Sequence, residues 1–152
     1  MPQPSPQDEH FLRYAIALSH QVRRQGKHPF AALVVDAAGQ IVAEAGNDSL
    51  PPEGDPTRHA ELVAAALAAR HLPPEVLAGA TLYSSAEPCA MCAGAIYWCG
   101  IGRVVYALSE HALLGLTGDH PENPPLSLPR PEGFSRGQRH TEVGGPALEA
   151  GA

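Results

Sequence analysis

Two short motifs constrain this chain more than any other feature of its sequence. His59 and Glu61 flank Ala60 in the first, and the second is Pro88 to Cys92, in which Cys89 and Cys92 are three residues apart. At the start of a helix, side chains with this spacing project from neighbouring turns toward one point. One imidazole and two thiolates form a ligand set that Zn²⁺ accepts with its fourth position left for water. The fold must therefore bring both motifs to one metal site.

Glu61 gives this site a chemical role, because a carboxylate beside a metal-activated water can accept and return protons. Two alternatives use the same cysteine spacing: a redox dithiol and a structural zinc knuckle. A structural site has little use for a carboxylate next to the metal. The two motifs together therefore favour catalytic zinc, with Glu61 as the proton shuttle.

The pattern His-x-Glu followed by Pro-Cys-x-x-Cys resembles that of the cytidine/deoxycytidylate deaminase superfamily of zinc deaminases. The resemblance covers about residues 8–118. It implies an α/β fold, a three-layer α/β/α sandwich around a mixed five-stranded sheet, assembled as a homodimer. It also implies one Zn²⁺ per chain, bound by His59, Cys89 and Cys92.

The resemblance further implies residues that bind the substrate. The backbone amide of Ala60 and the side chain of Asn47 match positions that contact the base or sugar, although Asn47 also suits a plain turn. Phe30, in the segment 28–30, matches a Pro-Phe that packs against the purine in bacterial guanine deaminases. The segment 94–98, which includes Trp98, is also similar to that group. Phe30 and Trp98 are equally compatible with core positions.

Bacterial guanine deaminases carry an acidic residue after the last clear strand, and Asp119 and Glu122 are the candidates for that role. No aromatic residue follows Phe134, so an aromatic C-terminal lid of the kind found in those enzymes is different or absent. The substrate prediction is therefore a guanine-type base. Cytosine or cytidine, tRNA adenosine and a purely structural zinc domain remain alternatives. The tRNA reading is favoured by the segments 55–61 and 102–105, which that group shares in similar form.

Charge argues against a nucleic acid partner. The chain has a net charge of −6, and its 10 basic residues form no cluster larger than Arg23 and Arg24 with nearby Lys27. Phosphate backbones are normally bound by a basic face. We therefore expect a small-molecule nucleobase or nucleoside as substrate.

Length and composition indicate one globular deaminase domain over residues 1–152, in which 119–152 form an irregular, proline-rich tail. No apolar run is long enough to cross a bilayer, and Met1 to Gln7 lack the features of a secretory signal. Three cysteines suit a reducing cytoplasm better than a disulfide scaffold. Cys99 is left over and is expected to pack as a small side chain.

The N-terminal half predicts a helix, a hairpin and a second helix. Ser5 and Asp8 form a capping-box pattern for a helix that ends near Gly26. Two strands, 30–35 and 41–43, are joined by a hairpin loop, and both are expected to be buried. A helix capped by Asp55 is predicted to run to Arg70, with the apolar face listed here: Leu62, Val63, Ala66 and Leu67.

The C-terminal half predicts a βαβ unit at the metal site. Strands at 81–84 and 103–107 flank a helix that begins near Cys89 and ends at Gly100. A strand, helix and strand in so short a stretch require parallel pairing and a right-handed crossover. A further short helix is expected over 109–116.

Overall fold

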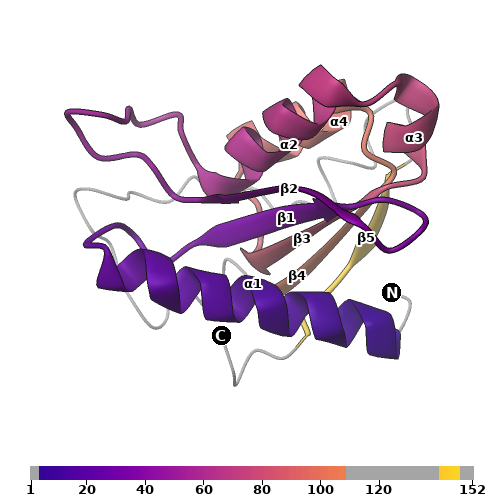
Figure 1. The fold of residues 1–152 in the computed structure, drawn as a ribbon, viewed down its shortest axis with the longest axis horizontal. Coiled ribbons are helices and arrows are strands. Elements are labelled where there is room, and N and C mark those ends of the chain that lie inside the picture. Colours follow the sequence, from indigo (N-terminus) through magenta and orange to yellow (C-terminus); the bar gives the residue numbers. More distant parts are fainter. Residues whose placement is uncertain (1–3, 109–140, 148–152) are drawn as a thin grey trace.

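The computed structural model describes residues 4–108 and 141–147. A sheet with the strand order β2-β1-β3-β4-β5 lies between α1 on one face and α2, α3 and α4 on the other (Figure 1). This arrangement confirms the predicted three-layer sandwich around a mixed five-stranded sheet. Among the described residues, no helix is both long and apolar enough to cross a bilayer.

Helix α1 (Pro6–Arg24) begins with the predicted capping box, since the Ser5 hydroxyl accepts from the Asp8 amide and the Asp8 carboxylate accepts from the Ser5 amide. Its buried stripe contains Phe11, Leu12, Ala15 and Ile16 and packs against β1, β3 and β4. The capping-box pattern therefore predicted where this helix begins, and its apolar face packs on the sheet.

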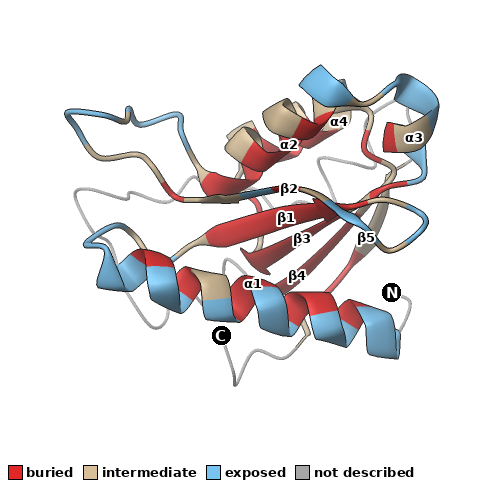
Figure 2. Ribbon diagram, in the orientation of Figure 1, coloured by how far each residue is buried: buried red, intermediate tan, exposed pale blue. Residues whose placement is uncertain are grey.

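Strands β1 (Ala31–Val35) and β2 (Ile41–Gly46) form the predicted antiparallel hairpin. Every residue of β1 is buried, as expected for a central strand. The prediction that the second strand is also buried was wrong: β2 is an edge strand, and of its residues only Ala43 is buried (Figure 2).

Strands β3 (Thr81–Ala86) and β4 (Arg103–Leu108) run parallel and are joined through α4 (Ala90–Cys99), which confirms the predicted βαβ unit. Gly100 ends α4 in the left-handed conformation, with φ of 78°. Strand β5 (Glu142–Gly144) pairs in parallel with β4. The segment expected to be an irregular tail therefore contributes a strand. The helix expected over 109–116 lies outside the described residues.

Helix α2 (Ala60–His71) begins four residues later than predicted, with His59 and not Asp55 as its N-cap residue. Asp55 does not cap it, because its carboxylate accepts instead from the amide and hydroxyl of Thr57 in a turn of its own. The predicted apolar face was also wrong. Its four residues are half-buried, and the fully buried face consists of small side chains: Ala60, Ala64, Ala65 and Ala68. A face of alanines lets α2 approach the sheet closely.

Helix α3 (Pro74–Ala78) was not predicted from the sequence. Pro73 lies between the two helices, where it is the N-cap residue of α3. Pro74 occupies the first turn of α3, a position where the missing amide hydrogen costs nothing.

A buried polar network ties the two ends of the fold together. Asp8 is 2% exposed and accepts from both terminal nitrogens of Arg103 at 2.7 Å and from the Tyr83 hydroxyl at 2.6 Å. Nε of Arg103 also lies 3.5 Å from Oε1 of Glu142 on β5. The guanidinium beside Asp8 holds the pKa of that carboxyl well below its usual range. One ion pair therefore links α1 to β4 and, through Arg103, to β5.

Candidate metal centre

The site is built from the starts of two neighbouring helices. His59 is the N-cap residue of α2 and Cys89 is the N-cap residue of α4, and neither side chain caps its own helix. Cys92 lies in the first turn of α4 and is fully buried. Since α2 and α4 pack against each other, both positive helix ends meet at this point. The fold therefore favours thiolate ligands here.

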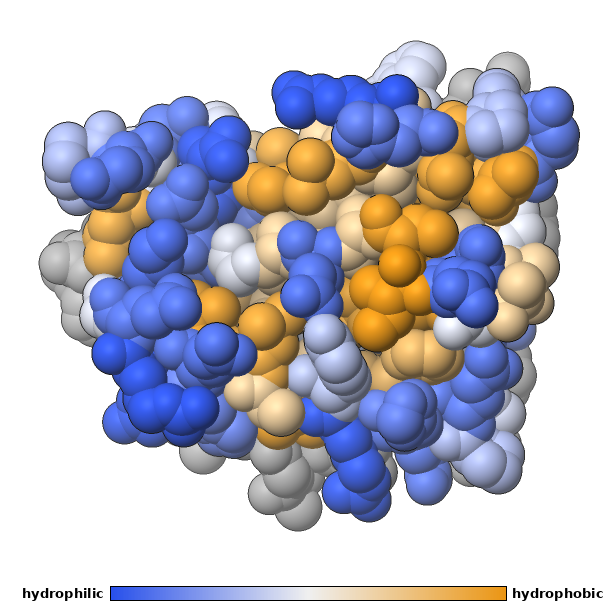
Figure 3. Space-filling model, in the orientation of Figure 1, coloured by the Kyte–Doolittle hydropathy of each residue, from blue (hydrophilic) through white to orange (hydrophobic). Residues whose placement is uncertain are grey.

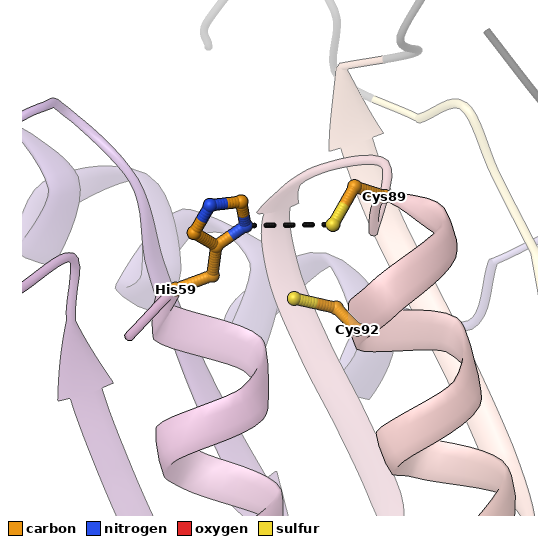
Figure 4. Close-up of side chains that lie close together, drawn as sticks. All are labelled: His59, Cys89 and Cys92. Atoms are coloured by element: carbon orange, nitrogen blue, oxygen red, sulfur yellow. Dashed lines mark hydrogen bonds between the residues drawn. The ribbon is translucent and has the colours of Figure 1, made fainter. Parts of the chain in front are cut away.

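The three candidate ligands of the metal lie close together (Figure 4). Their ligand atoms are all within 4.8 Å of one another, and Sγ of Cys89 is 3.4 Å from Nδ1 of His59. Ordinary Zn–S and Zn–N bond lengths in a tetrahedral site place such atoms about 3.6–3.8 Å apart. The spacing and the donor set both fit zinc, and the sequence prediction of these three residues agrees with the geometry.

Taken by themselves, these side chains share their protons unequally. A hydrogen bond with the thiol of Cys92, followed by one with His59, lowers the pKa of Cys89 to about 4. The same sulfur pairing and burial raise the pKa of Cys92. The hydrogen bond to Cys89 raises the pKa of His59, against the effect of burial. Cys89 is therefore a thiolate near neutral pH, the form in which cysteine binds a metal.

Glu61 lies in the first turn of α2, two residues from His59, and is 7% exposed. Burial, followed by the negative charge on Cys89, raises the pKa of its carboxyl to about 7. A carboxyl group with a pKa near neutrality can both accept and release a proton in a catalytic cycle. The position and environment of Glu61 therefore suit the proton shuttle expected from the sequence.

Two of the expected substrate-binding residues lie at the same edge of the sheet. Asn47 directly follows β2 and is 4% exposed, and its amide donates to the carbonyl oxygen of Phe30 at 2.9 Å. Phe30 is half-buried and packs against the core beneath α2. Ala60 is fully buried in the first turn of α2, next to His59. The structure thus brings Asn47 next to Phe30, the residue that immediately precedes β1.

Sequence reasoning missed Ser49, whose amide and hydroxyl both donate to Oδ1 of Asn47, at 3.0 and 2.8 Å. These bonds fix the orientation of the Asn47 side chain. The sequence Asn-Asp-Ser is typical of a turn in which an Asn side chain accepts from the amide two residues on. That signal could have identified Ser49.

Trp98 is not a core residue, as one interpretation of the sequence had it, because 76% of its surface is exposed. It lies near the C-terminal end of α4, about 12 Å along the helix axis from its start beside Cys89. It therefore does not lie at the metal site of its own chain. The acidic candidates Asp119 and Glu122 lie outside the described residues.

The fold and the site define a class of protein: an α/β/α sandwich with one histidine and two cysteines that could hold zinc and a buried carboxyl group beside them. The family model for the cytidine and deoxycytidylate deaminase zinc-binding region matches residues 5–108. The chain belongs to this family and is therefore a zinc-dependent hydrolase of nucleobase or nucleoside amidines.

Relatives with several substrates share this fold. A probable cytosine deaminase of Schizosaccharomyces pombe is 41% identical over 145 residues, which are 95% of this chain and 87% of the relative. A tRNA-specific adenosine deaminase of Haemophilus influenzae is 39% identical over 104 residues, 68% of this chain and 60% of that enzyme.

Among solved structures, guanine deaminase from Nitrosomonas europaea has a TM-score of 0.74 at 25% identity, covering 99% of this chain and 81% of that one. A related structure in complex with 8-azaguanine has a TM-score of 0.76, also at 25% identity, and covers 97% and 81% of the two chains. The fold and the class of reaction are therefore common to all of these proteins, whereas their substrates differ.

Proposed function

We propose that this protein hydrolyses a guanine-type base, replacing its exocyclic amine with a carbonyl and releasing ammonia. The observation that carries the proposal is a buried carboxyl group, Glu61, two residues from one candidate zinc ligand and within reach of electrostatic interaction with the other two. Zinc at such a site activates water as a nucleophile and polarises its O–H bonds. His59, Cys89 and Cys92 hold the metal through one nitrogen and two sulfurs.

The role of Glu61 follows from its burial. Its carboxylate accepts a proton from the attacking water and delivers it to the ring nitrogen beside the reacting carbon. Glu61 then takes the proton of the newly added hydroxyl group and delivers it to the departing amine, so that the carbonyl forms and ammonia leaves as a neutral molecule. Because burial raises its pKa to about 7, this carboxyl group can both accept and release a proton near neutral pH.

The amide of Ala60 and the side chain of Asn47 orient the base, and Phe30 packs against its ring. Ser49 supports this role of Asn47, because it occupies Oδ1 and so fixes the direction in which the amide group of that side chain points. A flat purine is supported by the related structure that binds 8-azaguanine. Asp119 or Glu122 is the proposed acidic contact to the purine.

Cytosine is the alternative substrate, since the cytosine deaminase relative matches almost the whole of this chain. Transfer RNA is disfavoured by the net charge of −6. The test is a panel of guanine, cytosine, adenine, their nucleosides and a tRNA transcript, with ammonia release as the readout. We expect guanine to give the highest kcat/KM. Preference for cytosine or for tRNA would refute the guanine assignment while leaving the deaminase class intact.

We further propose that the enzyme is a cytoplasmic homodimer. The exposed indole of Trp98 on α4 supports the dimer, since tryptophan is enriched at the centres of protein interfaces. Light scattering coupled to size-exclusion chromatography tests it, and a monomer at micromolar concentration would refute it. The cysteine content supports the location.

A further inference from the structure

The loop between β2 and α2 connects two residues of the site. Asn47 is the first residue of this loop and His59 is the last. Each of them has one neighbour inside the loop. Those adjacent residues are Asp48, directly after Asn47, and Arg58, directly before His59. The loop extends to one side of the sheet in Figure 1.

Asp48 and Arg58 are joined twice. The Asp48 amide donates to the Arg58 carbonyl oxygen at 2.9 Å, and Nε of Arg58 donates to Oδ2 of Asp48 at 3.1 Å. Backbone and side chain thus close the base of the loop at the same pair of residues. Nζ of Lys27 also lies 3.4 Å from Oδ1 of Asp48, which connects the pair to the segment after α1.

The loop packs closely above this pair. A Cβ atom at Gly54 would overlap the carbonyl oxygen of Asp48, and the Gly54 amide donates to the Leu50 carbonyl oxygen at 3.0 Å. Only glycine fits at this approach. The backbone of Asp48 is therefore held from the loop side as well as from Arg58.

His59 depends on this loop for its orientation. It has an extended backbone, with φ of −74° and ψ of 152°, and its amide donates to Thr57 in the loop. Because His59 is the N-cap residue, its carbonyl accepts the first hydrogen bond of α2, from the Val63 amide at 3.0 Å, whereas its own amide is held by the loop and not by the helix. What holds Arg58 therefore helps to place the imidazole of His59.

We propose that Asp48 and Arg58 are positioning residues, which set the separation between His59 at the metal and Asn47 at the substrate. The part of this role that concerns Asn47 rests on the proposed function, because it assumes that Asn47 binds the base. The part that concerns His59 and zinc does not. The pair acts through its neighbours and touches neither the metal nor the base.

The pair contributes little to global stability. The side chains of Asp48 and Arg58 are 25% and 44% exposed, and the surface over this loop is mostly hydrophilic (Figure 3). Ion pairs with this exposure are weak because water competes for both charges. Loss of the pair should consequently alter zinc and substrate affinity more than the melting temperature.

The test compares Asp48→Asn, Arg58→Met and the double variant, with Glu53→Gln as control. Glu53 lies exposed in the same loop, so its replacement removes the same charge as Asp48→Asn. Zinc dissociation constants are measured by competition with a chelator, and KM, kcat and melting temperature are measured on the zinc-loaded proteins.

We expect each single variant to raise the zinc dissociation constant and KM by about two- to fivefold, with kcat and melting temperature close to wild type. The double variant should bind zinc and substrate no more weakly than Asp48→Asn alone, because both substitutions break the same side-chain interaction between Asp48 and Arg58. The control should match wild type.

Unchanged zinc affinity in Asp48→Asn would overturn the proposal, as would fully additive effects in the double variant. A fall in melting temperature with no change in zinc affinity would assign the pair a merely structural role and also overturn it. If no base is a substrate, the proposed function fails, but the zinc measurement still decides this inference.

Discussion

Replacing Asp8 with asparagine should cost this protein much of its stability. The substitution keeps the shape of the side chain and removes its charge, whereas Arg103 keeps its own. The carboxylate is 2% exposed and accepts from Arg103 twice, from Tyr83 and from the Ser5 amide. The main cost in folding free energy comes from the positive charge of Arg103, which loses its carboxylate partner.

Removal of one partner from a buried ion pair costs about 3–5 kcal/mol. A quarter of the Arg103 side chain is exposed, at 25%, so water can solvate part of the charge that remains. We therefore expect a loss at the lower end, about 3 kcal/mol in the free energy of unfolding. For a domain of this size, that loss lowers the melting temperature by about 6–12 °C.

The effect should depend on pH in a defined direction. The hydrogen bonds from Arg103 lower the pKa of Asp8 in the folded protein. The carboxylate therefore stabilises the fold fully at pH values above the unfolded pKa of about 3.9, and this stabilisation is lost as the pH falls further. The difference between wild type and Asp8→Asn should be constant from about pH 5 to 8 and should shrink below about pH 4.

Urea denaturation of the zinc-saturated proteins measures this difference, with Glu9→Gln as the matched control on the exposed side of the same helical turn. The double variant Asp8→Asn/Arg103→Met should lose less than the sum of the single variants, since the uncompensated charge is gone. A loss below about 1 kcal/mol, or effects that simply add, would refute the reasoning.

Three further predictions concern the site, the core and the assembly. Cys92→Ser should purify with little zinc, because a hydroxyl replaces a thiolate ligand; metal analysis measures this, and full zinc content would exclude Cys92 as a ligand. Ala64→Leu should cost about 1–3 kcal/mol in thermal or urea unfolding, because it overpacks the alanine face of α2, whereas Ala66→Leu at a half-buried position should not; equal costs would contradict the assigned face. Trp98→Ser should shift the protein toward monomer in light scattering, and an unchanged dimer would place the interface elsewhere.

The sequence predicted which three side chains come together at the candidate metal site, because zinc chemistry demands particular residues at particular spacings. The three candidate ligands, His59, Cys89 and Cys92, meet as expected. The βαβ unit follows from the small number of residues that separate its two strands in the sequence. The capping box of α1 was equally clear, since Ser5 and Asp8 satisfy each other within one turn.

Local signals were less reliable where tertiary packing decides. Asp55 followed by proline looks like a helix start, but the chain makes a separate turn before α2 begins. Alanines form the buried face of α2 because it approaches the sheet closely, so the larger Leu62 and Val63 lie toward its side. The exposure of β2 and Trp98 depends on strand order and helix orientation, which periodicity alone does not contain.

The most direct test of the account is ammonia release from the preferred base by wild type and Glu61→Gln at equal zinc content. Glutamine keeps the shape of the side chain but cannot carry the proton. The account predicts full zinc occupancy in both proteins and a loss of about 10²–10⁴-fold in kcat for the variant. Equal rates in the two proteins would contradict the role assigned to Glu61, and no ammonia from any base with the zinc-loaded wild type would contradict the deaminase itself.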